Sequence, residues 1–319
     1  MNEKPITLRA IISEFNNDAK ARELIEGIRW PNGPVCVHCG HDKAYTIKGK
    51  AESTNPAKAG TYKCAKCRKK FNVCMGTILE KSHISLGNWL VATILMCSSK
   101  KGISAKQIQR LLGLSSYQTA WFMCHRIRHG MTEATETKLS GIVEADETYV
   151  GGKPRKGKSA EMQVNSGIRY SYGRGTHKSP VFALVQRDGK ARARVFPNVT
   201  AANLRTEFAH VDKSATLYTD DFKVYRGIGR DFAKHEHTMH KIGQYSKGDG
   251  IHSNTVECFF SLLKRGIYGQ FHNVSKKHLQ RYVDEAVFKW NYRKGSDGER
   301  FKTAVKLFEG KRLQYQRPD

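Results

Sequence analysis

Two short acidic sequences, EADET at 144–148 and TDD at 219–221, end runs of β-branched and aromatic residues that are typical of strands. Alternation places Glu144 and Asp146 on one face of the first strand. A carboxylate in such a run is costly unless it meets a cation. Aspartates at the ends of neighbouring strands, here Asp146 and Asp220, offer the hard oxygen ligands that Mg²⁺ prefers. Two such ions support in-line phosphoryl displacement, although strand-end aspartates also commonly cap turns.

A third polar group is expected from the sequence IHSNTVECFFSLLKRG at 251–266, which predicts a helix over about 252–266. Asn254, Glu257 and Lys264 interrupt its otherwise apolar pattern. Because Glu257 and Lys264 are seven residues apart, they lie two turns apart on one side of the helix. The first turn of this helix would present either Asn254 or Glu257 to the two strand ends. Lys264, two turns after Glu257, would hold a DNA phosphate.

Two Cys-x-x-Cys sequences, CVHC at 36–39 and CAKC at 64–67, are separated by 24 residues. Two such knuckles complete a tetrahedral zinc site, which we expect to be structural because the segment is short and poor in apolar residues. The expected zinc ligands are Cys36, Cys39, Cys64 and Cys67. A redox pair or buried thiols are the alternatives, and three other residues could substitute as ligands: His38, His41 and Cys74. The remaining cysteines lie on apolar helical faces and are expected in the core: Cys97, Cys124 and Cys258.

The charge balance restricts the class of partner. The 319 residues include 55 Lys and Arg against 29 Asp and Glu, a formal net charge of +26. So large an excess indicates a polyanionic partner, most often nucleic acid, in preference to a basic surface kept for solubility. No run of about twenty apolar residues predicts a transmembrane helix, and the N-terminal residues lack a signal-peptide layout. We therefore expect a cytoplasmic protein without a membrane partner, in which cysteines bind metal rather than form disulfides.

Hydrophobic periodicity divides the chain into a helical part and a mixed part. Helical spacing predicts helices at 12–29, 86–97, 104–112, 116–130, 199–211, 252–266 and 275–292. Strand-like runs occupy 142–146, 181–186, 193–197 and 215–220. The order of these elements indicates a mixed α/β domain from about residue 140, and the polar residues 133–140 are expected to be a linker.

Residues 103–130 predict two short helices joined at Gly113, the arrangement of a DNA-binding helix-turn-helix. Ser104 is the expected N-cap of the first helix, and Thr200 that of a later one. The inward face is expected to hold Ile108, Leu111, Leu112, Ala120, Met123 and Ile127. The outward face, available to phosphates or bases, is expected to hold Tyr117, Gln118, Arg126, Arg128 and His129. An ordinary helical hairpin is the alternative.

Two further segments are rich in groups that attract phosphate. The glycine-rich basic stretch 151–180 is expected to be a disordered loop in the absence of DNA. With DNA it is expected to contact the backbone, giving affinity but little sequence reading, through Lys153, Arg155, Lys156 and Lys158. His235, His237 and His240 are closely spaced, but no second set of ligands accompanies them. DNA contact or packing is therefore expected of these histidines in preference to a metal site.

Together these segments resemble a known family: bacterial insertion-sequence transposases of the DDE type with an N-terminal zinc ribbon, the ISXO-type group. The resemblance extends over nearly the whole chain and rests on RWPNGPVCVHCG, YKCAKCRKKFNVCMGTILEKSHISLGNW, KKGISAKQIQRLLGLSSYQTAWFMCHRIR, VEADETYVGGK, YTDDFKVY and HSNTVECFFSLLKRGIYGQFHNVSKKHLQRYVDEAVFKWNYR. It implies a catalytic core of ribonuclease-H-like fold with Asp146 and Asp220 as the catalytic aspartates. The third position in such families is Glu or Asn within an HxNxxE sequence. Glu257 is favoured over Asn254 because Lys264 follows it at the spacing familiar in DDE enzymes.

The resemblance also implies a domain plan and a reaction. The plan is an α+β and α/β multidomain protein with a helical segment 1–34, a zinc ribbon 35–80, a helix-turn-helix region 81–132, a core 140–295 and a tail 296–319. With two Mg²⁺ ions held by Asp146, Asp220 and Glu257, water would cut the element end, and the freed 3′-hydroxyl would attack target DNA. The implied partners are double-stranded DNA, as terminal inverted repeats and target, and further copies of the chain in a dimer or larger assembly. The alternatives are a non-catalytic DNA-binding regulator and a metal-dependent nuclease or resolvase.

Overall fold

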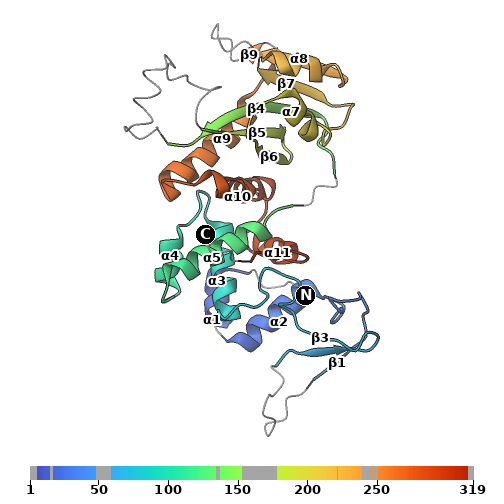
Figure 1. Ribbon diagram of the computed structural model, residues 1–319, viewed down its shortest axis with the longest axis vertical. Helices are drawn as coiled ribbons and strands as arrows, with labels where there is room; N and C mark the ends of the chain where they lie inside the picture. The colour runs from blue at the N-terminus through green and yellow to red at the C-terminus, as the bar shows by residue number, and fades with distance from the viewer. Residues whose placement is uncertain are drawn as a thin grey trace. The chain divides into compact units, whose positions relative to one another are not determined.

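The computed structural model divides the chain into two compact units (Figure 1). Unit 1 combines Met1–Thr132 with Tyr292–Asp319, and unit 2 is Glu133–Asn291. The structure describes residues 6–14, 17–47, 59–133, 137–152, 178–220, 222–238, 246–247 and 251–314. Within these ranges, no helix has both the length and the apolar character needed to cross a membrane.

Helices make up most of unit 1: α1 Leu8–Glu14, α2 Asp18–Arg29, α3 Leu86–Ser98, α4 Ala105–Leu111, α5 Tyr117–Gly130 and α11 Asp297–Leu307. The single helix predicted over 12–29 is two helices. A cap begins the second of them, because the side chain of Asn17 accepts a hydrogen bond from the amide of Ala19 at 2.7 Å. The central helix is α3, which contacts α1, α2, α5 and α11. It buries Trp89, Leu90, Ile94 and Met96.

The turn between α4 and α5 largely follows the sequence prediction. Ser104 and Ser116 cap the two helices by accepting hydrogen bonds from backbone amides at 3.1 and 3.2 Å. Gly113 has a φ of +60°, a left-handed conformation that glycine adopts without strain. Four of the residues predicted to face inward are buried: Ile108, Ala120, Met123 and Ile127. Leu111 is 57% exposed, so its predicted inward orientation is wrong.

The C-terminal residues that were expected to form a tail contain α11. Ser296 and Glu299 form a capping box at its start. Apolar residues at helical spacing are buried along it: Phe301, Ala304, Val305 and Phe308. The helix packs on α2, α3 and α5, so the end of the chain completes the core of unit 1.

A small antiparallel sheet precedes α3 in unit 1. Its strands β1 Ala44–Thr46, β2 Tyr62–Cys64 and β3 Lys70–Phe71 lie in the order β1-β2-β3. The rings of Trp30, Tyr62 and Phe71 pack together with centroids 5.6 to 6.0 Å apart. This aromatic cluster joins the sheet to the end of α2, which ends at Arg29 as the sequence predicts.

Unit 2 is built on a five-stranded sheet in the order β6-β5-β4-β7-β8. The strands are β4 Ile142–Val150, β5 Ser179–Gln186, β6 Ala191–Val195, β7 Thr216–Asp220 and β8 Lys234–Thr238. β4, β5 and β6 pair antiparallel, whereas β4, β7 and β8 pair parallel. The four strands predicted from sequence are β4 to β7. The edge strand β8, with the sequence KHEHT, was not predicted because it lacks an apolar alternation. A separate pair consists of β9 Ser246–Lys247 and β10 Ile251–His252.

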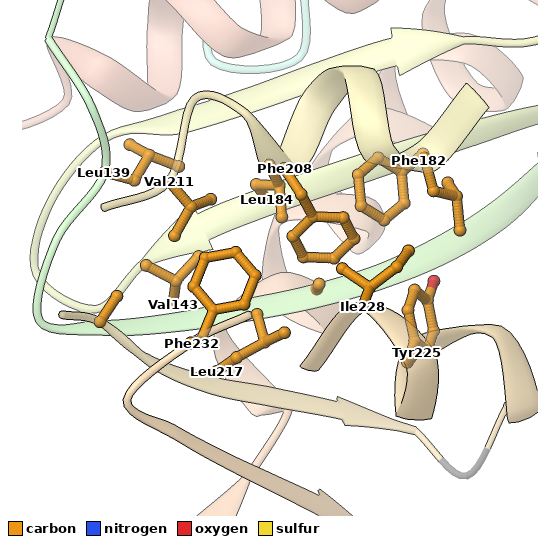
Figure 2. Packing of buried hydrophobic residues seen from close by; sticks show 13 residues of the cluster. Leu139, Val143, Phe182, Leu184, Phe208, Val211, Leu217, Tyr225, Ile228 and Phe232 are labelled. Atoms are coloured by element: carbon orange, nitrogen blue, oxygen red, sulfur yellow. The ribbon is translucent and has the colours of Figure 1, made fainter. Parts of the chain in front are cut away.

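One face of this sheet is covered by α7 Ala201–Phe208, which Thr200 caps as predicted, and α8 Lys223–Gly229. Val143, Leu184 and Leu217 of the sheet meet aromatic residues of these helices and their connections there, including Phe208, Tyr225 and Phe232 (Figure 2). This hydrophobic cluster leaves the even-numbered residues of β4 on the opposite face, because side chains alternate along a strand.

The opposite face is covered by α9 Asn254–Gly266 and α10 Leu279–Asn291. α9 contributes Val256, Phe259, Phe260 and Leu263, which pack with Val181, Ala183 and Val185 of β5. A π-helical turn, Ile267–Phe271, and a 3₁₀ turn, Lys276–His278, join the two helices. α9 therefore lies on the face of β4 that carries Glu144 and Asp146.

Candidate active site and metal centre

The N-terminal sheet brings the two cysteine knuckles together. The sulfur atoms of Cys36, Cys39, Cys64 and Cys67 all lie within 4.8 Å of one another. Two of the Sγ–Sγ distances, Cys36 to Cys67 and Cys39 to Cys64, are 3.6 Å. A tetrahedral zinc ion with Zn–S bonds of about 2.3 Å requires sulfur atoms about 3.8 Å apart. The four thiols therefore fit a zinc ion, as the sequence predicts.

Local backbone geometry supports this cluster. The amide of Gly40 donates to the carbonyl of Cys36 at 2.8 Å, and Arg68 turns the second knuckle with a φ of +62°. Burial raises the pKa of the Cys64 thiol, but hydrogen bonds from the amides of Cys67 and Lys66 and from neighbouring thiols outweigh it and lower the pKa to about 6. A thiol that deprotonates readily is suited to bind metal, because thiolate is the binding form.

The other candidate thiols and imidazoles stand apart from this cluster. His38 contacts the carbonyl of Lys70 at 3.2 Å, and burial raises the pKa of Cys74 to about 11. Among the described residues, the four cysteines are the only set of three or more His, Cys, Asp or Glu side chains gathered closely enough to hold one ion. Cys97 and Cys124 are buried as predicted, whereas Cys258 is exposed and its predicted core position is wrong. Cys258 lies next to the buried face of α9 but not on it.

The two predicted aspartates end adjacent parallel strands. Ala145 of β4 pairs with Thr219 of β7, so Asp146 and Asp220 follow at the same level of the sheet. Parallel strands in register direct such residues to the same face. Both residues are partly exposed. Asp146 Oδ1 accepts a hydrogen bond from the amide of Glu147 at 2.7 Å, and Asp220 Oδ1 accepts one from Phe222 at 3.0 Å.

Electrostatics link these aspartates to α9. Burial raises the pKa of the Asp146 carboxyl well above its ordinary value, and the carboxylates of Glu147, Asp220 and Glu257 raise it further. The hydrogen bond from the Glu147 amide acts in the opposite direction. Asp146 thus lies where several negative charges converge, a setting that a bound cation stabilises. The donor set is all carboxylate oxygen, which fits Mg²⁺.

The first turns of α9 present polar groups to solvent. Asn254 and Glu257 are exposed, Lys264 is partly exposed, and all three flank the buried stripe of the helix. Of the three, Glu257 is the one whose charge affects the pKa of Asp146. Asn254 is neutral and would not shift the pKa of Asp146 even if it lay equally near. Both Glu257 and Asn254 are therefore retained as candidates for the third ligand.

Sequence reasoning did not identify the contacts that hold α9 in place. Glu144 is fully buried, and its carboxylate accepts hydrogen bonds from the amides of Thr255 and Val256 at 2.7 and 3.0 Å. It also accepts from the Thr255 hydroxyl at 2.8 Å and from Arg187 Nε at 2.7 Å. The sequence argument that a carboxylate in such a strand must meet a cation was made for a bound metal ion, whereas the cation that Glu144 meets is Arg187.

A second unpredicted contact lies on the other face of β4. The hydroxyl of Tyr225, on α8, donates a hydrogen bond to Glu147. Burial raises the pKa of Tyr225 well above its ordinary value, and the charges of Glu147 and Asp146 add to this effect. The strand end that carries Asp146 is therefore held from both faces.

The predicted DNA-contacting side chains have different environments. Tyr117 is 50% exposed and Gln118 is exposed, at the start of α5. Arg126 and Arg128 are 6% and 2% exposed, so the prediction that they face outward is wrong. The guanidinium of Arg126 lies 5.1 Å from the ring centroid of Trp89 and donates to the carbonyl of Glu80 at 2.7 Å. Packing thus accounts for Arg126, whose periodic position looked outward in sequence.

Two groups of predicted residues fall wholly or partly outside the described ranges. Lys153, Arg155, Lys156 and Lys158 lie outside them, as does His240. Of the histidines that are described, His235 approaches the hydroxyl of Thr219, with Nε2 and Oγ1 2.9 Å apart. His237 lies beside it with ring centroids 6.5 Å apart. His235 therefore has the packing role that was expected in preference to metal binding.

Comparison with known proteins finds a family match for each of the two regions. Residues 138–291 match the family model described as the ISXO2-like transposase domain, and residues 16–70 match that of the transposase zinc-ribbon domain. An uncharacterised protein in the transposable element ISH50 of Halobacterium salinarum is 31% identical over 285 residues, covering 85% of this chain and 90% of that protein. The sheet carrying Asp146 and Asp220 lies within the first match, and the four cysteines lie within the second. The chain belongs to the family of insertion-sequence transposases with an ISXO2-like catalytic domain and an N-terminal zinc ribbon.

Proposed function

We propose that this transposase cleaves the ends of its insertion sequence and joins the freed 3′-hydroxyl to target DNA by Mg²⁺-dependent phosphoryl transfer. The observation that carries the proposal is the position of three carboxylates on one face of the sheet, contributed by β4, β7 and α9. Asp146 and Asp220 end neighbouring parallel strands, and Glu257 is near enough to raise the pKa of Asp146. Three acids without a chemical task would be an electrostatic cost at this position.

Each residue of the site has a proposed role. Asp146, Asp220 and Glu257 hold two Mg²⁺ ions. When bound, these ions supply charge stabilisation and activate the attacking oxygen. Lys264, two turns after Glu257, holds a DNA phosphate and orients the scissile strand against the carboxylates. Asn254 is the rival to Glu257 as third ligand, through its amide oxygen.

The sheet order and pairing favour a ribonuclease-H-like core. The chain makes an antiparallel β4-β5-β6 meander and then adds β7 and β8 parallel to β4. This arrangement puts the ends of β4 and β7 side by side, as the resemblance to DDE enzymes implies. The fold alone would not establish the chemistry, which rests on the carboxylates.

DNA recognition is proposed for unit 1. The zinc ribbon and the α4–α5 hairpin, acting as a helix-turn-helix, would bind the terminal inverted repeats. Tyr117 and Gln118 are exposed at the start of α5, where such a helix contacts bases. The net charge of +26 supports a polyanionic partner. Bringing two element ends together would engage two or more copies of the chain.

The test is a cleavage and joining assay on labelled double-stranded DNA that carries the element's ends, with Mg²⁺ or Mn²⁺. Wild type is compared with Glu257→Gln and Asn254→Ala, and DNA binding is measured in parallel. We expect wild type to cut and join, and Glu257→Gln to bind normally but neither cut nor join. Asn254→Ala is expected to retain activity.

Three other outcomes would redirect the proposal. An active Glu257→Gln with an inactive Asn254→Ala would make Asn254 the third ligand. Cutting without joined products would indicate a metal-dependent nuclease or resolvase. Wild type that binds the ends and never cuts them, with either ion, would indicate a DNA-binding regulator.

A further inference from the structure

The start of α9 is capped from a distant strand. In most helices the side chain of the N-cap residue accepts a hydrogen bond from one of the first free amides. The N-cap of α9 is Ser253, and the amides of the second and third helical residues, Thr255 and Val256, donate to Glu144 Oε2 instead. The acceptor lies 111 residues earlier in the sequence than Thr255.

The carboxylate of Glu144 is fully engaged at both oxygens. Oε2 accepts the two amides, and Oε1 accepts Arg187 Nε at 2.7 Å and the Thr255 hydroxyl at 2.8 Å. Four donors on two oxygens suit a carboxylate, which only accepts hydrogen bonds. An amide in its place would set an NH₂ group against donors at one end. Glutamine is therefore a close match in shape and a poor match in chemistry.

Arg187 ties the same carboxylate to the segment that leads into α9. Its Nη2 donates to the carbonyl of His252 at 2.8 Å, and its guanidinium lies 4.8 Å from the ring centroid of Tyr218 on β7. Glu144 is completely buried. One ion pair thus joins β4, the residue that follows β5, the Tyr218 ring of β7 and His252, two residues before the start of α9. Because desolvation offsets much of the attraction in a buried ion pair, we expect this one to contribute more to a defined geometry than to net stability.

We infer that Glu144 is a positioning residue of the transposase, which fixes the first turn of α9 so that Glu257 faces Asp146 and Asp220. Glu144 and Asp146 are two residues apart on one face of β4, and Glu257 lies one residue beyond the amides that Glu144 holds. The distance between the strand carboxylates and the helix carboxylate is therefore set by this contact. The inference rests on the proposed function, because it assigns Glu144 to the assembly of that metal site.

The test compares Glu144→Gln with a matched control, Glu207→Gln. Glu207 of α7 is also buried and also pairs with an arginine of unit 2, Arg192, at 3.6 Å, but on the other face of the sheet. Hydrogen–deuterium exchange of the full-length protein without Mg²⁺ reports on residues 252–258. Mn²⁺ binding, followed by calorimetry, and the Mg²⁺ concentration that half-saturates DNA cleavage report on the metal site.

We expect Glu144→Gln to expose the first-turn amides to faster exchange and to weaken Mn²⁺ binding by about ten- to hundredfold, the scale found for residues that orient metal ligands. Half-saturation of cleavage should shift by a similar factor while DNA binding is retained. Glu207→Gln should change neither the exchange of residues 252–258 nor Mn²⁺ affinity. If Glu144→Gln matches Glu207→Gln in both measurements, Glu144 is a structural residue only and the inference is overturned.

A gentler variant covers the case in which Glu144→Gln fails to fold. Thr255→Val removes the hydroxyl donor and keeps both amides, so Mn²⁺ binding should be weaker than in wild type by less than about tenfold, and Thr255→Ser should bind as wild type does. Unchanged Mn²⁺ affinity in Thr255→Val would contradict the inference. Failure of the proposed function is a separate result: protein that binds Mn²⁺ in a Glu144-dependent way, yet never cuts DNA, would support the positioning role and contradict transposition chemistry.

Discussion

The zinc ribbon and the acidic centre are assembled in different ways. The four cysteines come from two short knuckles within one three-stranded sheet, and their sulfur atoms are already within 4.8 Å of one another. The carboxylates come from β4, β7 and α9, and the described acids are less closely gathered than the thiols. The first centre depends on local turns, whereas the second depends on the register of a sheet and the position of a distant helix.

This difference indicates where each centre is vulnerable. A cysteine change should affect the ribbon and little else, because few other elements share its contacts. The acidic centre should respond to changes in residues that never contact metal or DNA, because Glu144, Arg187 and Tyr225 hold the elements that carry it. The following variants would break or sharpen that contrast.

The largest effect is expected from removing zinc with a chelator or by Cys64→Ser. Structural zinc contributes roughly 10–16 kcal/mol of apparent binding free energy to small folds, so the ribbon should unfold. Trp30 packs on Tyr62 and Phe71 and should become exposed, with a red-shifted fluorescence. Zinc content, tryptophan fluorescence and limited proteolysis measure this, and unit 2 should remain resistant to protease.

The matched control for that experiment is Cys258→Ser, since Cys258 is exposed and far from the knuckles in sequence. It should retain one zinc ion per chain. A metal-free ribbon that still resisted protease would show that its aromatic cluster is sufficient for folding.

The next effect is expected from Asp220→Asn. Losing one of the carboxylates proposed to hold Mg²⁺ weakens the charge stabilisation that the metal would supply, and should lower the cleavage rate about a thousandfold or more. Zinc content and DNA affinity should be unchanged, because the ribbon is a separate structure. Asp231→Asn is the control: this carboxylate is partly exposed beside Arg205 and Lys213 and should leave the cleavage rate unaltered. Equal rates for the two variants would exclude Asp220 from the site.

A moderate effect on stability is expected from Tyr225→Phe. The variant loses the hydrogen bond to Glu147 inside unit 2, which should cost about 0.5–1.5 kcal/mol of unfolding free energy. Urea denaturation measures the change. Tyr268→Phe is the comparison, because that hydroxyl is exposed and contacts the backbone of Gly151 only at 3.3 and 3.4 Å. If both variants lose the same unfolding free energy, the buried hydrogen bond of Tyr225 stabilises the protein no more than the exposed contact of Tyr268.

The smallest effect is a pH dependence from His235 on β8. Burial lowers the pKa of His235, the neighbouring His237 lowers it further, and Glu236 opposes this. The unfolded chain then binds the proton more tightly, so stability is complete above about pH 6.5 and declines as pH falls below it. One pKa unit corresponds to about 1.4 kcal/mol, and a partly exposed ring should contribute less.

Urea denaturation of His235→Gln at several pH values between about 5 and 8, where histidine titrates, would test this dependence. The slope should lessen but persist, because burial also lowers the pKa of His210 and of His278. A slope identical to wild type would assign the dependence to those two residues.

Features determined by neighbouring residues were predictable from sequence. The cysteine knuckles and the caps Ser104 and Thr200 need only a few residues of context, and the structure confirms each of them. The pairing of β4 with β7 was inferred from two strand-end aspartates, and it is observed. If Asp146 and Asp220, at the ends of the strands predicted at 142–146 and 215–220, are to share one site, those two strands must be neighbours and parallel.

Features determined by distant residues were not predictable in the same way. Helical periodicity placed Arg126 on the outward face, whereas contacts with the ring of Trp89 and the carbonyl of Glu80, both distant in sequence, accompany its burial. The capping of α9 by Glu144 joins residues 111 positions apart, which no local pattern encodes. α11 is a different case: its capping box, Ser296 and Glu299, followed by apolar residues at helical spacing, was readable in the sequence.

Unit 1 is made of two stretches of the chain that are far apart in sequence, and this affects how it folds during synthesis. The core around α3 needs α11, and Ser98 and Asp297 are about 200 residues apart in the chain. At roughly 5–20 residues per second, a ribosome takes about 10–40 s to make the intervening segment. The N-terminal helices of unit 1 therefore wait through the synthesis of the whole of unit 2 before α11 can complete their core. A nascent chain that stops before α11 would carry the carboxylates of unit 2 but lack the helix that completes the core of unit 1.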